Sequence, residues 1–235
     1  ISHIAIKVTG FARFALLEKI HAGNLLTENE AGEYKRAQSR VQAVCEAAAA
    51  HKVGIMMDAE ESWIQQPVDS LCLQMMMQFN KTEALIFNTY QLYRHDRLLF
   101  LQESFRQAQQ QKFILGAKLV RGAYMEKERR RAKEMHYPSP IQINKEATDK
   151  DYNAAILFCL DNLDGISFII ASHNEYSNLL TTQIMQQKNI SLHHPHVHFA
   201  QLFGMSDHIT FNLAKAGCQV SKYLPYGPVE DVIPY

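Results

Sequence analysis

The chain alternates short stretches rich in apolar and β-branched residues with longer stretches in which apolar residues recur at helical spacing. The short stretches predict strands at residues 3–10, 53–60, 83–90, 113–120, 167–174, 197–204 and 219–227. The longer stretches predict helices at residues 33–52, 67–80, 95–112, 149–163, 178–188 and 207–217. Every strand but the last is followed by a helix, and such βα repeats predict an α/β fold of parallel strands.

The number of βα units favours one architecture. A (β/α)₈ barrel usually takes about 250 residues, and this chain of 235 residues holds seven predicted strands. We therefore expect a distorted (β/α)₈, TIM-like barrel that lacks its first strand and last helix within these residues. A doubly wound sheet is the competing fold, and no G-x-G-x-x-G motif supports it. Residues 1–235 are interpreted as a single, partial barrel domain.

Alternation along each strand divides its side chains between the barrel interior and the surrounding helices. In the fourth strand, Leu115 and Leu119 are expected to face the helices and Lys118 the interior. In the third, Phe87 is assigned to the helix side and Asn88 to the interior. The polar residues that end the interior series are Lys7, Asp58, Asn88, Lys118 and His173. Barrel enzymes place their chemistry at the carboxyl ends of the strands, so these residues predict a functional site.

The segment GAKLVRGAYMEKE (residues 116–128) places two cations, Lys118 and Arg121, at the end of a strand expected to be buried. A buried cation needs a partner, which is either a carboxylate of the chain or a bound anion. A structural ion pair between Lys7 and Asp58 is a further possibility that the sequence leaves open.

Composition narrows the classes of function. The formal net charge is zero, which gives no sign of nucleic-acid binding. No apolar run approaches the ~20 residues of a membrane span, and no signal-like segment opens the chain. The cysteines are far apart, which favours free thiols in a reducing compartment: Cys45, Cys72, Cys159 and Cys218.

The segment HHPHVHF (residues 193–199) contains an H-x-H pair, His196 and His198, of the kind that some metal-dependent barrel hydrolases use. No carboxylates stand obviously near it, so solvated histidines at a loop-to-strand junction are the favoured interpretation. A metal-dependent barrel remains an alternative, although we assign no metal ligands.

Several motifs, read together and in order, resemble proline dehydrogenase. They are MMDAEES (56–62), KLVRGAYMEKE (118–128), SHN (172–174), QLFGMSD (201–207) and KYLPYGPVEDVIPY (222–235). The resemblance runs over nearly the whole chain and is closer to the mitochondrial and single-function bacterial branch. It implies a flavoenzyme with FAD at the barrel mouth that oxidises L-proline to Δ1-pyrroline-5-carboxylate. It further implies electron transfer to a membrane quinone, peripheral membrane contact, and a place in the bacterial cytoplasm at the inner membrane or on the mitochondrial matrix side.

The resemblance also implies roles for individual residues. Lys118 takes the place of the cation beside the flavin, and Asn88 that of an amide that hydrogen-bonds it. The other residues it implies in cofactor binding are Asp58, Val120, Arg121, Gly122, Ala123, Tyr124, Ser172, His173, Asn174, Gln201 and Leu202. For the substrate, Lys7 would bind the carboxylate of proline and Asp58 would orient the binding residues. Leu202 and Tyr223 would form walls for the proline ring.

The resemblance leaves the substrate open between proline and hydroxyproline, since a hydroxyproline dehydrogenase shares the fold and cofactor. Tyr223 favours proline, because its hydroxyl would crowd a 4-hydroxyl group. In the family, an arginine pair beyond the last strand grips the substrate carboxylate, and the printed residues end at Tyr235, before that position. We therefore expect weak or no activity from these residues alone.

Overall fold

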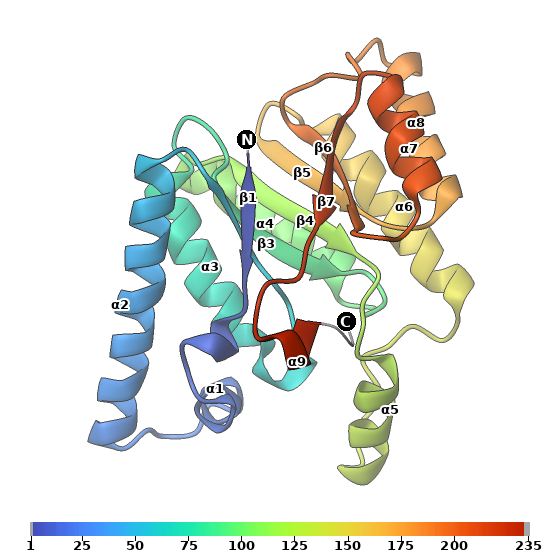
Figure 1. Ribbon diagram of the computed structural model, residues 1–235. Helices are drawn as coiled ribbons and strands as arrows, with labels where there is room; N and C mark the ends of the chain where they lie inside the picture. Colours follow the sequence, from blue (N-terminus) through green and yellow to red (C-terminus); the bar gives the residue numbers. More distant parts are fainter. Residues whose placement is uncertain (1, 233–235) are drawn as a thin grey trace. The chain divides into compact units, whose positions relative to one another are not determined.

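The computed structural model describes residues 2–232, whose elements are traced in Figure 1. The strands are β1 (His3–Ile6), β2 (Gly54–Met57), β3 (Ile86–Gln91), β4 (Leu115–Val120), β5 (Ile166–Ala171), β6 (Val197–Leu202) and β7 (Gln219–Tyr223). The α-helices are α1 (Phe14–His21), α2 (Glu28–Ala50), α3 (Gln65–Phe79), α4 (Arg97–Gln111), α5 (Met125–Glu134), α6 (Lys145–Asp161), α7 (Glu175–Gln187), α8 (Asp207–Lys215) and α9 (Val229–Val232). Two short 3₁₀ helices are η1 (Val8–Gly10) and η2 (Ser62–Ile64).

The structure confirms the α/β class, with a strand overlapping each of the predicted strand segments. Helix α1 was not predicted, and helix α2 begins at residue 28 rather than 33. The early start has a local cause, because Thr27 and Glu30 form a reciprocal capping box. Among the helices within residues 2–232, none combines the length and apolar character that crossing a bilayer requires.

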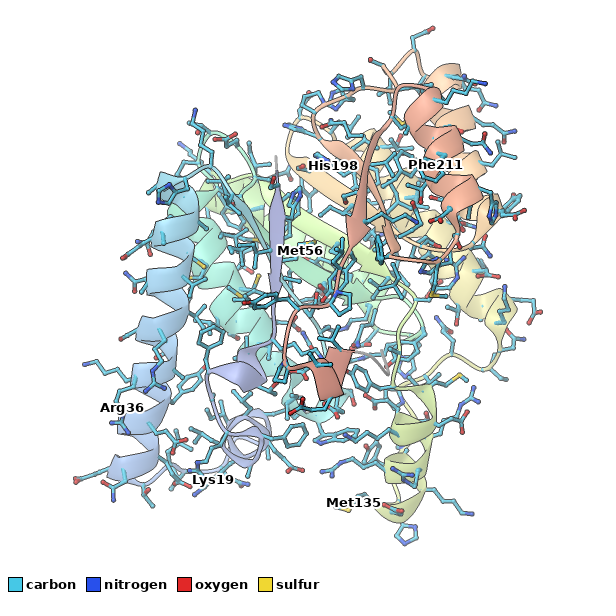
Figure 2. The ribbon with its side chains drawn as sticks, in the orientation of Figure 1. Lys19, Arg36, Met56, Met135, His198 and Phe211 are labelled. Atoms are coloured by element: carbon cyan, nitrogen blue, oxygen red, sulfur yellow. The ribbon has the colours of Figure 1, made fainter. Side chains whose placement is uncertain are left out.

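The chain divides into two compact units, Ile1–Phe168 and Ile169–Tyr235, and strand β5 crosses the boundary. In the first unit, β1, β2, β3 and β4 pair in that order and all pairs are parallel. Helices α2, α3, α4 and α6 pack against these strands. In the second unit, β6 and β7 are parallel neighbours, and α8 packs against both while exposing Phe211 to solvent (Figure 2).

Strand register places side chains of the first unit in rows across the sheet, because partners in parallel strands point to the same face. One row joins Ala5, Met56 (labelled in Figure 2) and Phe87. The next position along the same face of β3 is Thr89, whose partner on β4 is Lys118. We call this side of the sheet the Lys118 face.

The opposite side of β3 faces the helices. The Asn88 amide donates a hydrogen bond to Asp69 of α3 over 2.9 Å, and Tyr90 packs against Phe100 of α4 with ring centroids 5.7 Å apart. The assignment of Asn88 to the interior and Phe87 to the helices was therefore wrong by one position. Both faces of β3 are buried along its whole length, so apolar and polar residues do not alternate along it. The sequence therefore does not indicate which residues of β3 face the interior and which face the helices.

Asn80 ties the starts of β3 and β4 together. Its side chain is fully buried and accepts hydrogen bonds from the backbone N–H groups of Leu85 and Ile86 at 3.0 and 2.9 Å. Its amide donates to the carbonyls of Ile86 and Ile114 at 2.8 and 3.0 Å. The side-chain oxygen and amide group of Asn80 thus make all of these hydrogen bonds to backbone groups.

We predict that Asn80→Ala lowers the free energy of unfolding by roughly 2–4 kcal/mol, because it leaves buried backbone groups without partners. Urea denaturation of the variant measures this loss. Gln74→Ala on the exposed side of α3 is the control and should change stability by less than about 0.5 kcal/mol. Equal effects for the two variants would show that the network of Asn80 does not stabilise the sheet.

Candidate active site

The carboxyl ends of the first strands carry a buried ion pair. The Lys118 ammonium lies 2.6 Å from an Asp58 carboxylate oxygen, and Lys118 is only 7% exposed. Asp58 directly follows β2 and Lys118 lies on β4, so the pair spans the intervening strand β3 at the small side chain of Thr89. A carboxylate of the chain therefore partners this cation, and Asp58 pairs with Lys118 where a pair with Lys7 had been considered.

Lys7 lies at the edge of the same cluster. Its ammonium is 3.7 Å from a Glu60 carboxylate oxygen and donates a 3.4 Å hydrogen bond to the Tyr124 hydroxyl. Burial alone would lower the pKa of Lys7, but Tyr124 and Glu60 raise it overall above 10.5. Lys7 is thus a half-exposed cation, held beside Glu60 and the predicted site residue Tyr124 and able to reach an anion in solvent.

Gln91 is a residue of the Lys118 face that the sequence analysis missed. Its amide donates to the Glu60 carbonyl over 2.9 Å, and its Oε1 is buried with no hydrogen-bond partner within residues 2–232. In Asn88, by contrast, the amide donates to Asp69 and the oxygen accepts from the Thr89 N–H. The amide oxygen available on this face therefore belongs to Gln91. Gln91 lies two residues after Thr89, the register partner of Lys118, but the sequence alone does not identify that partner.

The segment after β4 keeps most of its predicted residues near the strand end. Arg121 bonds Asp149 at 2.7 Å and stacks over the Tyr152 ring at 4.3 Å, so its charge is also matched within the chain. Gly122 has φ of +141°, and a Cβ there would meet the Tyr93 ring at 2.4 Å. Only glycine fits this position. Val120 ends β4, while Ala123 is exposed and Tyr124 precedes α5.

A second missed residue, Glu128 of α5, fixes the loop that follows Asp58. Its fully buried carboxylate accepts hydrogen bonds from the Ser62 N–H at 2.6 Å and the Ser62 hydroxyl at 2.7 Å. Neighbouring Lys127 and Glu61 form an ion pair across the same junction. Helix α5 thereby connects the segment after β4 to the segment after β2. The sequence of α5 is mostly charged and carries no local signal of this buried contact.

In the second unit, His173 follows β5 and is held by two neighbours. The Leu202 N–H donates to its Nε2 over 3.4 Å, which makes Nδ1 the protonated nitrogen facing the Ser206 hydroxyl at 2.9 Å. Leu202 and Tyr223 are register partners at the ends of β6 and β7. The two residues expected to wall the substrate ring are therefore side by side.

The other predicted residues of this unit serve the local structure. Asn174 caps α7 by accepting from the Ser177 N–H at 2.9 Å, and its own N–H donates to the Ser172 hydroxyl at 3.1 Å. The buried Gln201 amide donates to the Ser172 carbonyl over 3.3 Å, and its oxygen accepts from Thr210. Lys118 and His173 belong to different units, so their contact with one common ligand stays a prediction.

The histidine-rich segment shows no assembled metal site. His198, labelled on β6 in Figure 2, contacts the Pro195 carbonyl at 3.0 Å, and the His194 and His196 rings pack edge to face. Within residues 2–232, no group of three or more histidine, cysteine or carboxylate side chains is arranged to hold a metal ion.

Parallel βα units with polar side chains at the carboxyl ends of the strands define the class as an α/β protein, consistent with a distorted TIM-like barrel. A family model described as proline dehydrogenase matches residues 2–235, and the chain belongs to that family.

Individual relatives agree with this assignment. Proline dehydrogenase 1, mitochondrial, of Drosophila melanogaster is 41% identical over 206 residues, which are 83% of this chain and 30% of that protein. Hydroxyproline dehydrogenase of Xenopus laevis is 37% identical over 92% of this chain and 47% of its own length. Proline utilization A from Bdellovibrio bacteriovorus has the same fold, with a TM-score of 0.86 and 20% identity over 98% of this chain and 23% of that one. The chain therefore spans only about a third of the fly enzyme.

We predict strong coupling between Lys118 and Asp58, because removing one partner leaves the other charge buried. Lys118→Met and Asp58→Asn should each cost roughly 2–4 kcal/mol of unfolding free energy, and the double variant less than their sum. Urea denaturation of the four proteins gives the coupling energy. The exposed pair Arg13 and Glu33 is the control, with coupling below about 1 kcal/mol. Additive effects for Lys118 and Asp58 would contradict the ion pair.

We predict that His173 titrates below pH 6.5, because burial and, secondarily, the Lys222 ammonium lower its pKa. As the pH falls, His173 takes up its proton in the unfolded chain before it does so in the folded chain. The stability that depends on a neutral His173 ring is therefore complete above pH 6.5 and is lost as the pH falls below that value. NMR titration, with the His173 signal assigned from its loss in His173→Gln, measures the pKa. The variant should also lose less stability between pH 7.5 and 5, and a pKa above 6.5 would refute the prediction.

Proposed function

We propose that this chain is the flavin-binding core of a proline dehydrogenase, which oxidises L-proline to Δ1-pyrroline-5-carboxylate and passes the electrons to a quinone. The observation that supports this proposal best is the buried Lys118 ammonium on one face of the sheet. The Gln91 oxygen lies on the same face and has no hydrogen-bond partner among the described residues. Family membership and the names of the relatives support proline as the substrate.

The residues of the Lys118 face fit an isoalloxazine ring, which presents both hydrogen-bond acceptors and an N–H donor. Gln91 Oε1 is a buried acceptor with no partner in the described part of the chain, which suits a ring N–H. Lys118 is a buried cation, which suits ring carbonyl oxygens and developing negative charge. FAD, when bound, supplies the acceptor for a hydride from the substrate. We assign Arg121 through Tyr124 to the same cofactor stretch, and Ser172, His173 and Asn174 to its contacts in the second unit.

Lys7 is the residue proposed to hold the substrate carboxylate. It is half-exposed and remains protonated well above neutral pH, so it offers a cation to an anionic group without leaving solvent entirely. Asp58 orients the site through its bond to Lys118, and Glu128 fixes the loop after Asp58. Leu202 and Tyr223, adjacent across β6 and β7, offer apolar surface for the substrate ring.

Hydroxyproline oxidation is the second candidate, because a hydroxyproline dehydrogenase is among the relatives. The Tyr223 hydroxyl favours proline over its 4-hydroxylated form. We further propose peripheral contact with a membrane that holds the quinone, on the matrix side of the mitochondrial inner membrane, as the names of mitochondrial relatives suggest, or on the bacterial inner membrane.

We predict that the natural full-length protein carries FAD and that L-proline bleaches its visible absorbance, faster than trans-4-hydroxy-L-proline does. Lys118→Met should slow the bleaching at least about 100-fold, because a positioned charge near developing negative charge is removed. Lys118→Arg should retain much more of the rate, since the charge remains. The matched control is Lys35→Met on the exposed side of α2, which should leave the rate unchanged.

A colourless protein that binds no FAD, or a flavoprotein that neither amino acid bleaches, would overturn the proposal. Faster bleaching by hydroxyproline would select the second candidate. Stopped-flow absorbance under anaerobic conditions separates these outcomes, because it follows the reductive step without a quinone.

A further inference from the structure

The first unit contains a cavity of about 320 Å³ on the opposite side of the sheet from Lys118. Its strand residues are Asn88, Tyr90 and Leu115, which the register assigns to the helix side of β3 and β4. Its volume lies at the small end of the range of about 300–1,000 Å³ for ligand pockets. The cavity is therefore separated by the sheet from the site proposed for proline oxidation.

One part of the cavity wall is apolar. Leu73 and Met76 of α3, Phe100 of α4, and Tyr90 and Leu115 of the sheet contribute to it. The Arg97 guanidinium lies over the Phe100 ring, 4.4 Å from its centroid. A ligand with a compact apolar body would bury that body against these side chains.

The polar part of the wall includes Arg94, which is 93% buried, since 7% of it is exposed. Its Nε and Nη2 bond the two oxygens of Asp96 at 3.1 and 2.8 Å. Its Nη1 is buried and has no hydrogen-bond partner within residues 2–232. A charged donor left in this state is unfavourable, and an acceptor that reaches it would be bound strongly.

The carboxylates near Arg94 are already engaged by another cation. Arg97 bonds Asp69 through Nη1 at 2.9 Å and Asp96 through Nη2 at 2.6 Å. His21 adds a second donor to the wall, since its Nδ1 accepts from the Gln66 N–H at 3.3 Å and the proton of the neutral ring is then on Nε2. Burial and the Arg94 charge lower the pKa of His21, which keeps the ring neutral.

We propose that this cavity binds a small organic monocarboxylate, with its carboxylate oxygen accepting from Arg94 Nη1 and its apolar body against Leu73, Met76 and Phe100. The apolar wall disfavours a phosphate, which has no apolar body to bury. A single negative charge suits a cluster in which two arginines already face two carboxylates. The site goes beyond the proposed function and does not depend on it.

The experiment measures binding of 4-fluorobenzoate to the full chain by ¹⁹F NMR, with 4-fluorobenzylamine as the cation of similar shape. We expect saturable binding of the carboxylate and none of the amine. Arg94→Met should weaken carboxylate binding at least tenfold. Arg106→Met, an exposed arginine of α4, is the matched control and should leave binding unchanged.

Leu73→Trp is a second variant that fills the apolar part of the cavity, and it should also weaken binding at least tenfold. It decides the question if Arg94→Met does not fold, which far-UV circular dichroism reports. No saturable binding to the natural chain, equal binding of the amine, or unchanged binding in whichever variant folds would overturn the proposal. Flavin content and bleaching by proline are measured separately, so failure here leaves the proposed function standing.

Discussion

The ion pair between Lys118 and Asp58 is the interaction on which the arrangement of the candidate site depends. A lysine that is 7% exposed needs its carboxylate at hydrogen-bonding distance, and here the two residues come from strands that are not neighbours. The side chain between them must be small, which Thr89 satisfies, and β2, β3 and β4 must keep one register. The loop after Asp58 must also stay in place, and the buried Glu128 carboxylate holds it through Ser62. One electrostatic contact thus constrains the strand order, the register and the position of α5.

The sequence predicted the order of strands and helices because each βα unit has its own hydrophobic period. It missed α1, which had no strong pattern, and the early start of α2, although Thr27 and Glu30 form a recognisable capping signal. The orientation of β4 was correct because Lys118 interrupts its apolar residues and marks the interior face. The orientation of β3 was wrong because both of its faces are buried, so that neither face is distinguished by polarity.

The residues of the candidate site likewise fall into those that the sequence predicted and those that it did not. Asp58 and Lys118 were expected at or near strand ends, and the structure has Asp58 directly after β2 and Lys118 two residues before the end of β4. Tyr223, which only the family resemblance had indicated, ends β7. Gln91 was missed for the same reason that Asn88 was misassigned. Glu128 could not be predicted, since its role comes from burial against Ser62, 66 residues earlier in the chain. The pairing of Lys118 with Asp58 is likewise a tertiary property that no local pattern encodes.

The internal partner of Lys118 changes how its charge would act on a bound ring. A lone buried lysine would present a full positive charge, whereas Lys118 and Asp58 together are neutral and present an oriented dipole. Such a dipole stabilises negative charge that develops near its positive end, and its effect falls more steeply with distance than that of an isolated charge. It also needs no reorganisation during the reaction, because the pair is already fixed by the sheet. The ion pair therefore suits a site in which negative charge develops on a bound ring that lies next to the Lys118 ammonium.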